Sequence, residues 1–290
     1  MKIIIIKKLL LTYILLLCFV INISCKTIPA QNTHPAKIFN TEKAISFFDE
    51  GVRFNKEQKF DKAIISFTEA IRILPSFQRA YITRGSVYYV LGRYSEAIKD
   101  FDNAILLGFQ NNTDYALGHY MKGRSLSALG EYGKAIEIFS YTLRITPFSA
   151  DVYNERGLAH YRTGNLTDAF ADFNFAISID SSNFNFFDNR GTIFYHLGMH
   201  GRALEDFLIS LMLNPNNAFA AKNIGAILKE LERYDASLEF FNMAITIDPS
   251  LLSAYYGRGR LYIILAELTN DITKRNEYLE KSKADFERSR

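Results

Sequence analysis

Cysteine is nearly absent, because Cys18 and Cys25 are the two cysteines in a chain of 290 residues. Both lie within the first twenty-five residues. The rest of the chain can therefore form neither a disulfide framework nor a cysteine-based metal site.

The chain also lacks an excess of charge outside its N-terminus. It has 34 Lys and Arg against 31 Asp and Glu, and residues 1–25 contain Lys2, Lys7 and Lys8 but no acidic residue. The remainder therefore has no net charge. Because phosphate neutralisation drives binding to nucleic acids, this balance argues against a nucleic-acid partner.

The sequence shows no catalytic motif. It contains no phosphate-binding loop and no nucleophile elbow. Among the five histidines, His196 and His200 have the i, i+4 spacing of a zinc-binding pair, but no third ligand follows them in sequence. We expect no enzyme, no metal and no cofactor, with a hydrolase whose site is assembled only in space as the remaining alternative.

What the sequence does contain is a repeat. A glycine recurs at intervals of thirty-four residues, with one interval of thirty-eight, and in most units an alanine follows it at twelve residues and a phenylalanine at sixteen. A fixed period of this length is typical of a solenoid. The glycines are Gly51, Gly85, Gly123, Gly157, Gly191, Gly225 and Gly259.

Each unit predicts two helices joined by a short turn. Apolar residues recur at helical spacing in two runs, and a glycine such as Gly164 often lies between them. A proline such as Pro215 follows where the second helix must stop. The recurring glycine sits between large rings, which should let the second helix approach closely, with Ala169 at the contact and Phe173 beside it.

This pattern resembles the tetratricopeptide repeat family. The resemblance covers roughly residues 44–290 and implies an all-α, right-handed superhelical solenoid of about seven helix hairpins. A four-residue insertion at 112–115 should lengthen one turn. The last unit contains about eleven extra residues around Thr269–Asn276, and its charged second helix should cap the stack.

The N-terminus resembles a bacterial lipoprotein signal. Residues 1–25 combine lysines, an apolar run and Ser24–Cys25, where Cys25 would be acylated. Residues 26–43 read as a tether, with a helix starting near Asn40 or Thr41. We expect export to the bacterial cell envelope with a lipid anchor; an ordinary cleaved signal and an uncleaved inner-membrane anchor are the alternatives.

Four units share a charged pair. An arginine precedes the recurring glycine, and an aspartate precedes the second-helix phenylalanine, as in Arg156 and Asp172. The other three units lack both residues. Their joint occurrence predicts a two-pronged contact between the helices, and an anion-binding arginine row is the alternative. The other pairs are Arg84 with Asp100, Arg190 with Asp206, and Arg258 with Asp285.

The resemblance also implies that the first helices line a groove for a partner. We expect the groove to be lined by the residues three before, one after and four after each glycine. These positions lie on the side of the helix away from the packed face, and tyrosine is frequent there. Packing against the next unit is an open alternative for each ring. The candidate residues are Phe48, Tyr89, Tyr120, Arg124, Tyr161, Tyr195, Lys222, Lys229, Tyr256 and Arg260.

These observations predict a non-enzymatic, envelope-anchored adaptor that binds a protein or peptide. An accessory lipoprotein of a solute-transport or ligand-binding system is the alternative, and a deep apolar pore between units would favour it. Capture of a partner's terminal carboxylate is disfavoured, because Lys222, Asn223 and Lys229 are confined to one unit. The sequence leaves the partner and the oligomeric state open.

Overall fold

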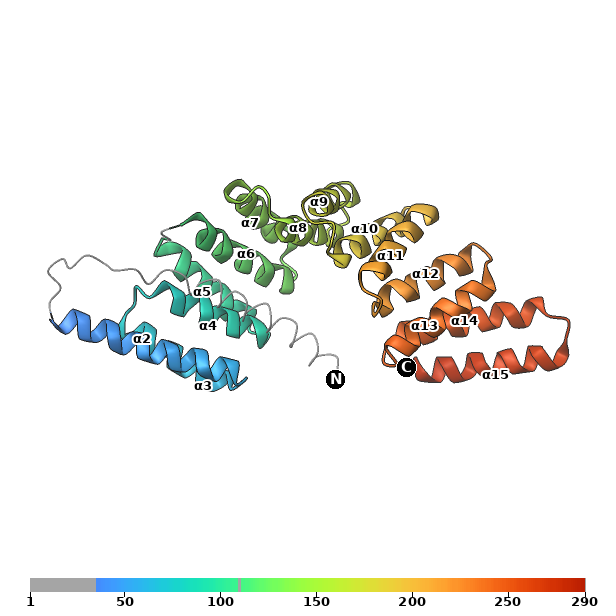
Figure 1. Ribbon diagram of the computed structural model, residues 1–290, viewed down its shortest axis with the longest axis horizontal. Coiled ribbons are helices and arrows are strands. Elements are labelled where there is room, and N and C mark those ends of the chain that lie inside the picture. Colours follow the sequence, from blue (N-terminus) through green and yellow to red (C-terminus); the bar gives the residue numbers. More distant parts are fainter. Residues whose placement is uncertain (1–34, 109–110, 290) are drawn as a thin grey trace. The chain divides into compact units, whose positions relative to one another are not determined.

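A computed structural model describes residues 35–108 and 111–289, with side chains described from residue 40 onward. This part contains fourteen helices and no strand. The all-α prediction is therefore confirmed. The described residues form two compact units, unit 1 up to Pro147 and unit 2 from Phe148 onward, and each is a stack of helix hairpins (Figure 1).

Unit 1 contains three hairpins in its described residues. Each helix packs against the next one along the chain, so consecutive hairpins are in contact. The helices are α2 (Pro35–Lys56), α3 (Phe60–Ile73), α4 (Gln78–Val90), α5 (Tyr94–Leu106), α6 (Asn112–Ala128) and α7 (Tyr132–Ile145).

Unit 2 contains four hairpins in its described residues. Successive helices again pack together, and α12 also contacts α14, the first helix of the following hairpin. The helices are α8 (Ala150–Arg162), α9 (Leu166–Ile179), α10 (Phe184–His196), α11 (His200–Leu213), α12 (Ala218–Glu230), α13 (Tyr234–Ile247), α14 (Leu252–Leu268) and α15 (Ile272–Arg288).

Glycine and proline end the helices as predicted. Gly164 has φ of 82° in the turn between α8 and α9, a left-handed conformation that glycine adopts without a Cβ clash. Pro215 lies two residues after α11 ends, where its ring prevents continuation of the helix.

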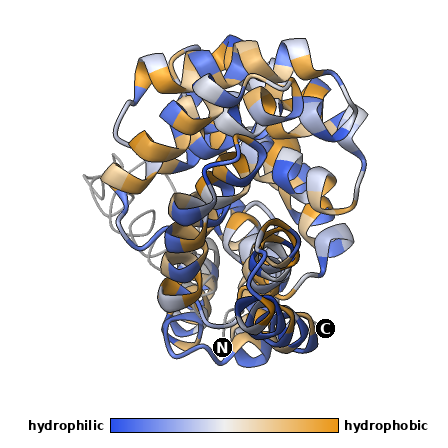
Figure 2. Cartoon of the chain, turned by 90° about the vertical axis from the view of Figure 1, so that its right-hand side faces the viewer, coloured by the Kyte–Doolittle hydropathy of each residue, from blue (hydrophilic) through white to orange (hydrophobic). Residues whose placement is uncertain are grey.

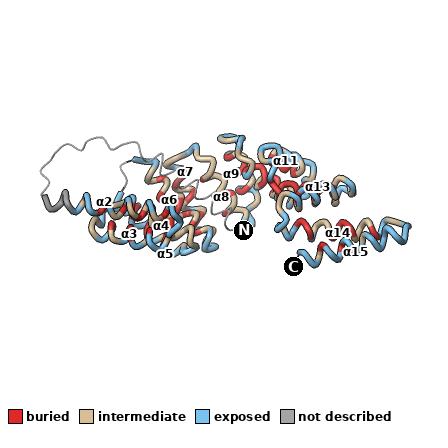
Figure 3. Tube along the Cα trace, turned by 60° about the horizontal axis from the view of Figure 1, so that its bottom comes forward, coloured by how far each residue is buried: buried red, intermediate tan, exposed pale blue. Residues whose placement is uncertain are grey.

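The recurring glycines allow the close helix contact that the sequence predicts. A Cβ built on Gly123 would lie 2.5 Å from Phe139, and one on Gly157 would lie 2.8 Å from Phe173. The second-helix phenylalanines of the first six hairpins are fully buried, and the buried residues lie where helices face each other (Figure 3). Hydrophobic and hydrophilic stretches alternate along the helices (Figure 2).

The insertion at 112–115 extends a helix, in contrast to the prediction of a longer turn. Residues 112–115 form the first turn of α6, where the side chain of Asn111 accepts a hydrogen bond from the Asp114 N–H at 2.8 Å. Four residues are about one helical turn, so the addition preserves the direction of the helix. In the last hairpin α14 and α15 are both longer, and Asp271 caps α15 at Ile272.

The first helix also begins earlier than predicted. α2 starts at Pro35, so Asn40 and Thr41 lie inside it and do not cap it. Proline suits the first helical turn, where its missing N–H would have had no helical partner. The proposed signal peptide with Cys25, and residues 26–34 of the tether, lie outside the described residues. None of the helices described is both long and apolar enough to span a bilayer.

Candidate functional site

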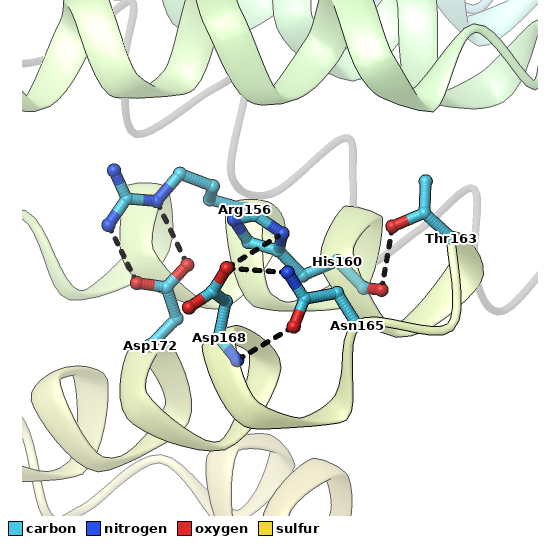
Figure 4. Close-up of polar contacts among 6 residues, drawn as sticks. All are labelled: Arg156, His160, Thr163, Asn165, Asp168 and Asp172. Atoms are coloured by element: carbon cyan, nitrogen blue, oxygen red, sulfur yellow. Dashed lines mark hydrogen bonds and ion pairs between the residues drawn. The ribbon is translucent and has the colours of Figure 1, made fainter.

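In four of the described hairpins, an arginine of the first helix forms an ion pair with an aspartate of the second helix. In each pair the arginine Nε donates to one carboxylate oxygen at 2.8 or 2.9 Å, and Nη2 donates to the other at 2.7 Å. This confirms the predicted two-pronged contact (Figure 4, for Arg156 and Asp172). The pairs are Arg84–Asp100, Arg156–Asp172, Arg190–Asp206 and Arg258–Asp285.

These arginines are structural groups. The Arg190 guanidinium lies between the rings of Phe187 and Phe194, at 5.7 and 5.9 Å from their centroids. Its side chain is 21% exposed and that of Asp206 is 3% exposed. Since both ends of the guanidinium are engaged by protein groups, the alternative of an anion-binding arginine row is not supported.

The third guanidinium nitrogen reaches the preceding hairpin, which the sequence reasoning missed. Arg190 Nη1 donates to Asn174 Oδ1 at 2.8 Å, and Arg258 Nη1 donates to Asn242 Oδ1 at 2.6 Å. Each acceptor directly follows the phenylalanine of the preceding second helix. A comparison of that position with the next unit's arginine would have revealed this link between hairpins.

Units without the arginine carry other residues at the same two positions, which are the one before the recurring glycine and the one after the preceding phenylalanine. Lys122 occupies the arginine position in α6, and its Nζ lies 2.6 Å from Asp102 Oδ1, the residue after the phenylalanine of α5. Between the hairpins of α11 and α12, Leu208 follows the phenylalanine and Ile224 precedes the recurring glycine. The polar contact between Lys122 and Asp102 therefore has no counterpart at Leu208 and Ile224, which are both apolar.

The groove candidates are ten residues on first helices, and we call them the first-helix row. Phe48 is part of the hydrophobic core. It is 7% exposed, and its ring centroid lies 5.6 Å from that of Phe67 and 5.0 Å from that of Phe77. For Phe48 the packing alternative is correct, and it is not available to a partner.

The remaining candidates of unit 1 form one contact group. The Arg124 guanidinium lies 5.1 Å from the Tyr89 ring and 5.7 Å from the Tyr120 ring. Both tyrosines are half-buried and pack beside Phe101 and Met121. Arg124 therefore joins the first helices of two adjacent hairpins through cation–π contacts.

Two tyrosines of unit 2 also bridge hairpins. The Tyr161 hydroxyl lies 2.8 Å from His196 Nε2, and the Tyr195 hydroxyl donates to Glu230 Oε1 at 2.6 Å. Burial raises the pKa of Tyr195 to about 12, and its hydrogen bond to Glu230 adds to the rise. Both side chains are half-buried. Their hydroxyl groups thus serve mainly the contact with the next hairpin.

A buried carboxylate lies three residues before the recurring glycine of α10. Asp188 is 7% exposed, and its Oδ2 accepts from Asn217 Nδ2 at 2.7 Å. Oδ1 has no hydrogen-bond partner among the described residues. Burial raises the pKa of Asp188 to about 6, and hydrogen bonds involving Ser210 and Asn217 and the charge of Lys222 oppose the rise.

Three cations and one ring complete the row in α12 and α14. Burial lowers the pKa of Lys222, and the negative charge of Asp188 partly opposes this shift. Burial and the charge of Arg260 lower the pKa of Lys229. Tyr256 is 53% exposed and Arg260 is exposed, so these two remain accessible within unit 2.

The histidines in the described part of the chain do not assemble a metal centre. No group of three or more His, Cys, Asp or Glu side chains in the described residues is arranged to hold a metal ion. His200 Nε2 lies 3.6 Å from Glu230, while His196 faces Tyr161. In the fourth hairpin His160 Nδ1 lies 4.0 Å from Asp168, which also interacts with Asn165 (Figure 4).

Comparison with known sequences finds tetratricopeptide repeats. Family models with this description match residues 78–111, 120–184 and 223–251. The Hsp70-Hsp90 organizing protein 3 of Arabidopsis thaliana is 33% identical over 99 residues, which are 34% of this chain and 17% of that protein. The chain spans about a fifth of the length of such curated relatives.

Solved structures agree on the fold. A repeat-containing protein from Cytophaga hutchinsonii superposes with a TM-score of 0.66 at 18% identity, covering 82% of this chain and 94% of the other. YrrB, described as a TPR protein with an unusual peptide-binding site, gives 0.51 at 22% identity and covers 63% and 92%. The three sequence matches show that this chain is a tetratricopeptide repeat protein, and the solved structures agree with its repeated hairpins.

Proposed function

We propose that this chain is a non-enzymatic adaptor that binds a protein or peptide along the first-helix row of unit 2. The observation that carries the proposal is the accessible ring of Tyr256 beside Arg260, four residues apart on α14 and therefore on one side of that helix. Aromatic and arginine side chains supply much of the binding energy at protein interfaces.

The relatives support a binding role of this kind. One is named for organizing Hsp70 and Hsp90, and YrrB is described as having a peptide-binding site. Those partners belong to those proteins. For this chain the proposal is limited to a polypeptide partner. The hydroxyl groups of Tyr161 and Tyr195 already bond to the next hairpin, so the accessible ring of Tyr256 and the guanidinium of Arg260 are the groups proposed to bind it.

Site-specific photocrosslinking tests this role. A photoreactive amino acid replacing Tyr256 should capture a discrete polypeptide in cells of the source organism, identifiable by mass spectrometry. Phe175 on the second helix α9 is the matched control, because it is 55% exposed and also aromatic. Equal capture of the same polypeptides from both positions would contradict recognition by the first-helix row.

We further propose that the chain is exported and anchored in the bacterial cell envelope by acylation of Cys25. The support is the N-terminal sequence, in which lysines, an apolar run and Ser24 precede Cys25. Cys25→Ala should release the protein from the membrane fraction, while Cys18→Ala should leave it there. An unchanged membrane fraction and unchanged mass for Cys25→Ala would contradict lipid anchoring.

A further inference from the structure

His119 on α6 is a buried histidine without a hydrogen bond. It is 9% exposed, and neither Nδ1 nor Nε2 has a hydrogen-bond partner among the described residues. Buried polar atoms are nearly always hydrogen-bonded, because leaving one unpaired costs free energy. The binding row and the ion pairs described above make no use of this side chain, so its presence in the core of the hairpin calls for an explanation.

The other hairpins carry no group that titrates near neutral pH at this position, four residues before the recurring glycine. Five of the six residues are aromatic and the sixth is alanine. In the arginine hairpins the guanidinium covers this ring, and in the hairpin of His119 the lysine at the arginine position pairs with the preceding hairpin instead. Imidazole is the one ring here that gains a proton on mild acidification. The residues at this position in the other hairpins are Phe47, Tyr81, Tyr153, Phe187, Ala221 and Tyr255.

Two tyrosine rings enclose the His119 imidazole. Its centroid lies 4.7 Å from that of Tyr115, which is four residues earlier on α6, and 4.7 Å from that of Tyr141 on α7. The hydroxyl oxygens of Tyr115 and Tyr141 lie 3.3 Å apart. We call these three residues the His119 cluster. Because Tyr141 belongs to the second helix, the cluster joins the two helices of one hairpin.

The charges around the cluster are mainly positive or already paired. Lys122 on α6 and Asp102 on α5 are the charged residues that act on His119. Lys122 Nζ lies 2.6 Å from Asp102 Oδ1, so the carboxylate is already engaged. On α7 the Arg144 guanidinium lies 5.1 Å from the centroid of the Tyr141 ring. The third neighbour of α6, α4, meets it beside a cluster of apolar side chains and tyrosines.

We propose that protonation of His119 opens the contact between α6 and α7, which makes this hairpin an acid-sensitive joint within unit 1. An imidazolium ion has two N–H donors, and neither would find an acceptor in the present position of the ring. A buried charge without a partner is costly, so the charged ring gains by moving into water. That movement takes it away from Tyr141 and removes a contact between the two helices.

The direction of the pH response follows from linkage. Burial and the charge of Lys122 lower the pKa of His119 in the folded chain, and the charge of Asp102 opposes this shift. In the open hairpin the imidazole has its ordinary pKa of about 6.5 and binds more protons than in the closed one. The open state is therefore favoured as pH falls. At pH 5.5 an ordinary imidazole is about ten parts protonated to one part neutral, so opening can increase by at most about tenfold.

Amide hydrogen exchange of the full chain, resolved by peptide mass spectrometry, measures this opening. Protection factors correct for the pH dependence of the intrinsic exchange rate. From pH 7.5 to 5.5 the protection of α6 and α7 should fall by up to about tenfold in the unaltered chain. His119→Phe should not show this fall, because it supplies a ring that cannot be protonated and that Phe47 and Phe187 already provide in other hairpins.

Two further measurements keep the test independent of how well His119→Phe folds. His160→Phe changes a histidine of unit 2 and should leave the response of α6 and α7 intact. NMR titration of the His119 ring protons in the unaltered chain should give a pKa below the ordinary value of about 6.5. Because Asp188 lies in unit 2, reading the exchange in α6 and α7 separates the response of His119 from that of Asp188.

Three results would overturn the inference. Equal loss of protection in His119→Phe would assign the acid response to another group. Unchanged protection of α6 and α7 at pH 5.5, or a titration of His119 at or above the ordinary pKa, would show that the cluster tolerates the charge. Loss of protection to the same extent in every hairpin would show that acid acts on the whole chain and not on this joint.

Discussion

At the scale of single residues, one turn position shows how the backbone conformation repeats while the side chain varies. The residue seven places after each recurring glycine of the first six hairpins has a left-handed conformation. Four of these positions hold glycine, but Gln58 has φ of 58° and Glu232 has φ of 60°. For residues with a Cβ this conformation costs about 1–2 kcal/mol.

Glu232→Gly should therefore stabilise the chain. We expect the free energy of unfolding to rise by about 1 kcal/mol, reduced slightly by the greater freedom of glycine in the unfolded chain. Chemical denaturation monitored by circular dichroism provides the measurement. Gly198→Ala is the reciprocal control and should cost a similar amount, and a loss of stability for Glu232→Gly would contradict the strain argument.

Asp188 should make stability depend on pH in an unusual direction. Its pKa in the folded chain is about 6, above the ordinary value of 3.8, so the folded state binds more protons between these values. Stability from this group is therefore greatest at low pH and falls as pH rises from about 4 to about 6. The loss amounts to about 3 kcal/mol at neutral pH.

Comparison with Asp188→Asn isolates this effect from the other titrating groups. The variant should be more stable than the unaltered chain at pH 7.5, and this advantage should shrink as pH falls toward 4. Denaturation curves at intervals of one pH unit would measure the difference. A constant difference across the range would show that Asp188 has no raised pKa.

At the scale of helices, the arginine pairs and the recurring glycines define the hairpin. The glycine permits close approach, and the arginine ties the first helix to an aspartate of the second while its remaining nitrogen reaches the preceding hairpin. Arg190 thus contacts three helices. We consider orientation of the hairpins to be the main effect of such pairs, because replacing a buried ion pair by apolar residues is often neutral or stabilising.

Removal of one partner should be more harmful than removal of both. Asp206→Ala leaves the Arg190 guanidinium without its counter-charge and should cost about 3–5 kcal/mol. The double variant Arg190→Met with Asp206→Leu should recover most of that loss. Urea denaturation of the three proteins measures this, and equal destabilisation by the single and double changes would refute the explanation.

At the scale of the whole molecule, contacts run mainly between helices that follow one another along the chain. Stability in such an array is approximately a sum over hairpins and their neighbours. A local defect should therefore loosen only the adjacent helices, in contrast to a globular domain, where one core serves the entire chain.

Phe67→Ala in unit 1 provides the corresponding test. Phe67 is fully buried between α2 and α3, so the substitution leaves a cavity beside Gly51. Hydrogen exchange should accelerate in α2, α3 and α4 and remain unchanged in α14 and α15. Faster exchange throughout the chain would indicate cooperative unfolding of all hairpins.

The sequence by itself determined the hairpins, their period and the arginine–aspartate contacts. These properties follow from local helix geometry and from residues that recur in several copies, such as Gly157 with Phe173 and Arg156 with Asp172. It also predicted the all-α class, because apolar spacing in each unit fits helices.

Only the tertiary structure decided which members of the first-helix row remain accessible. Phe48 enters the core, Tyr161 and Tyr195 bond to the next hairpin, and Tyr256 stays exposed, although all four fit one predicted stripe. Helical spacing reports the side of a helix, whereas accessibility depends on which groups of the following hairpin meet that side. The same reason explains why the burial of Asp188 next to Lys222 could not be read from their positions in sequence.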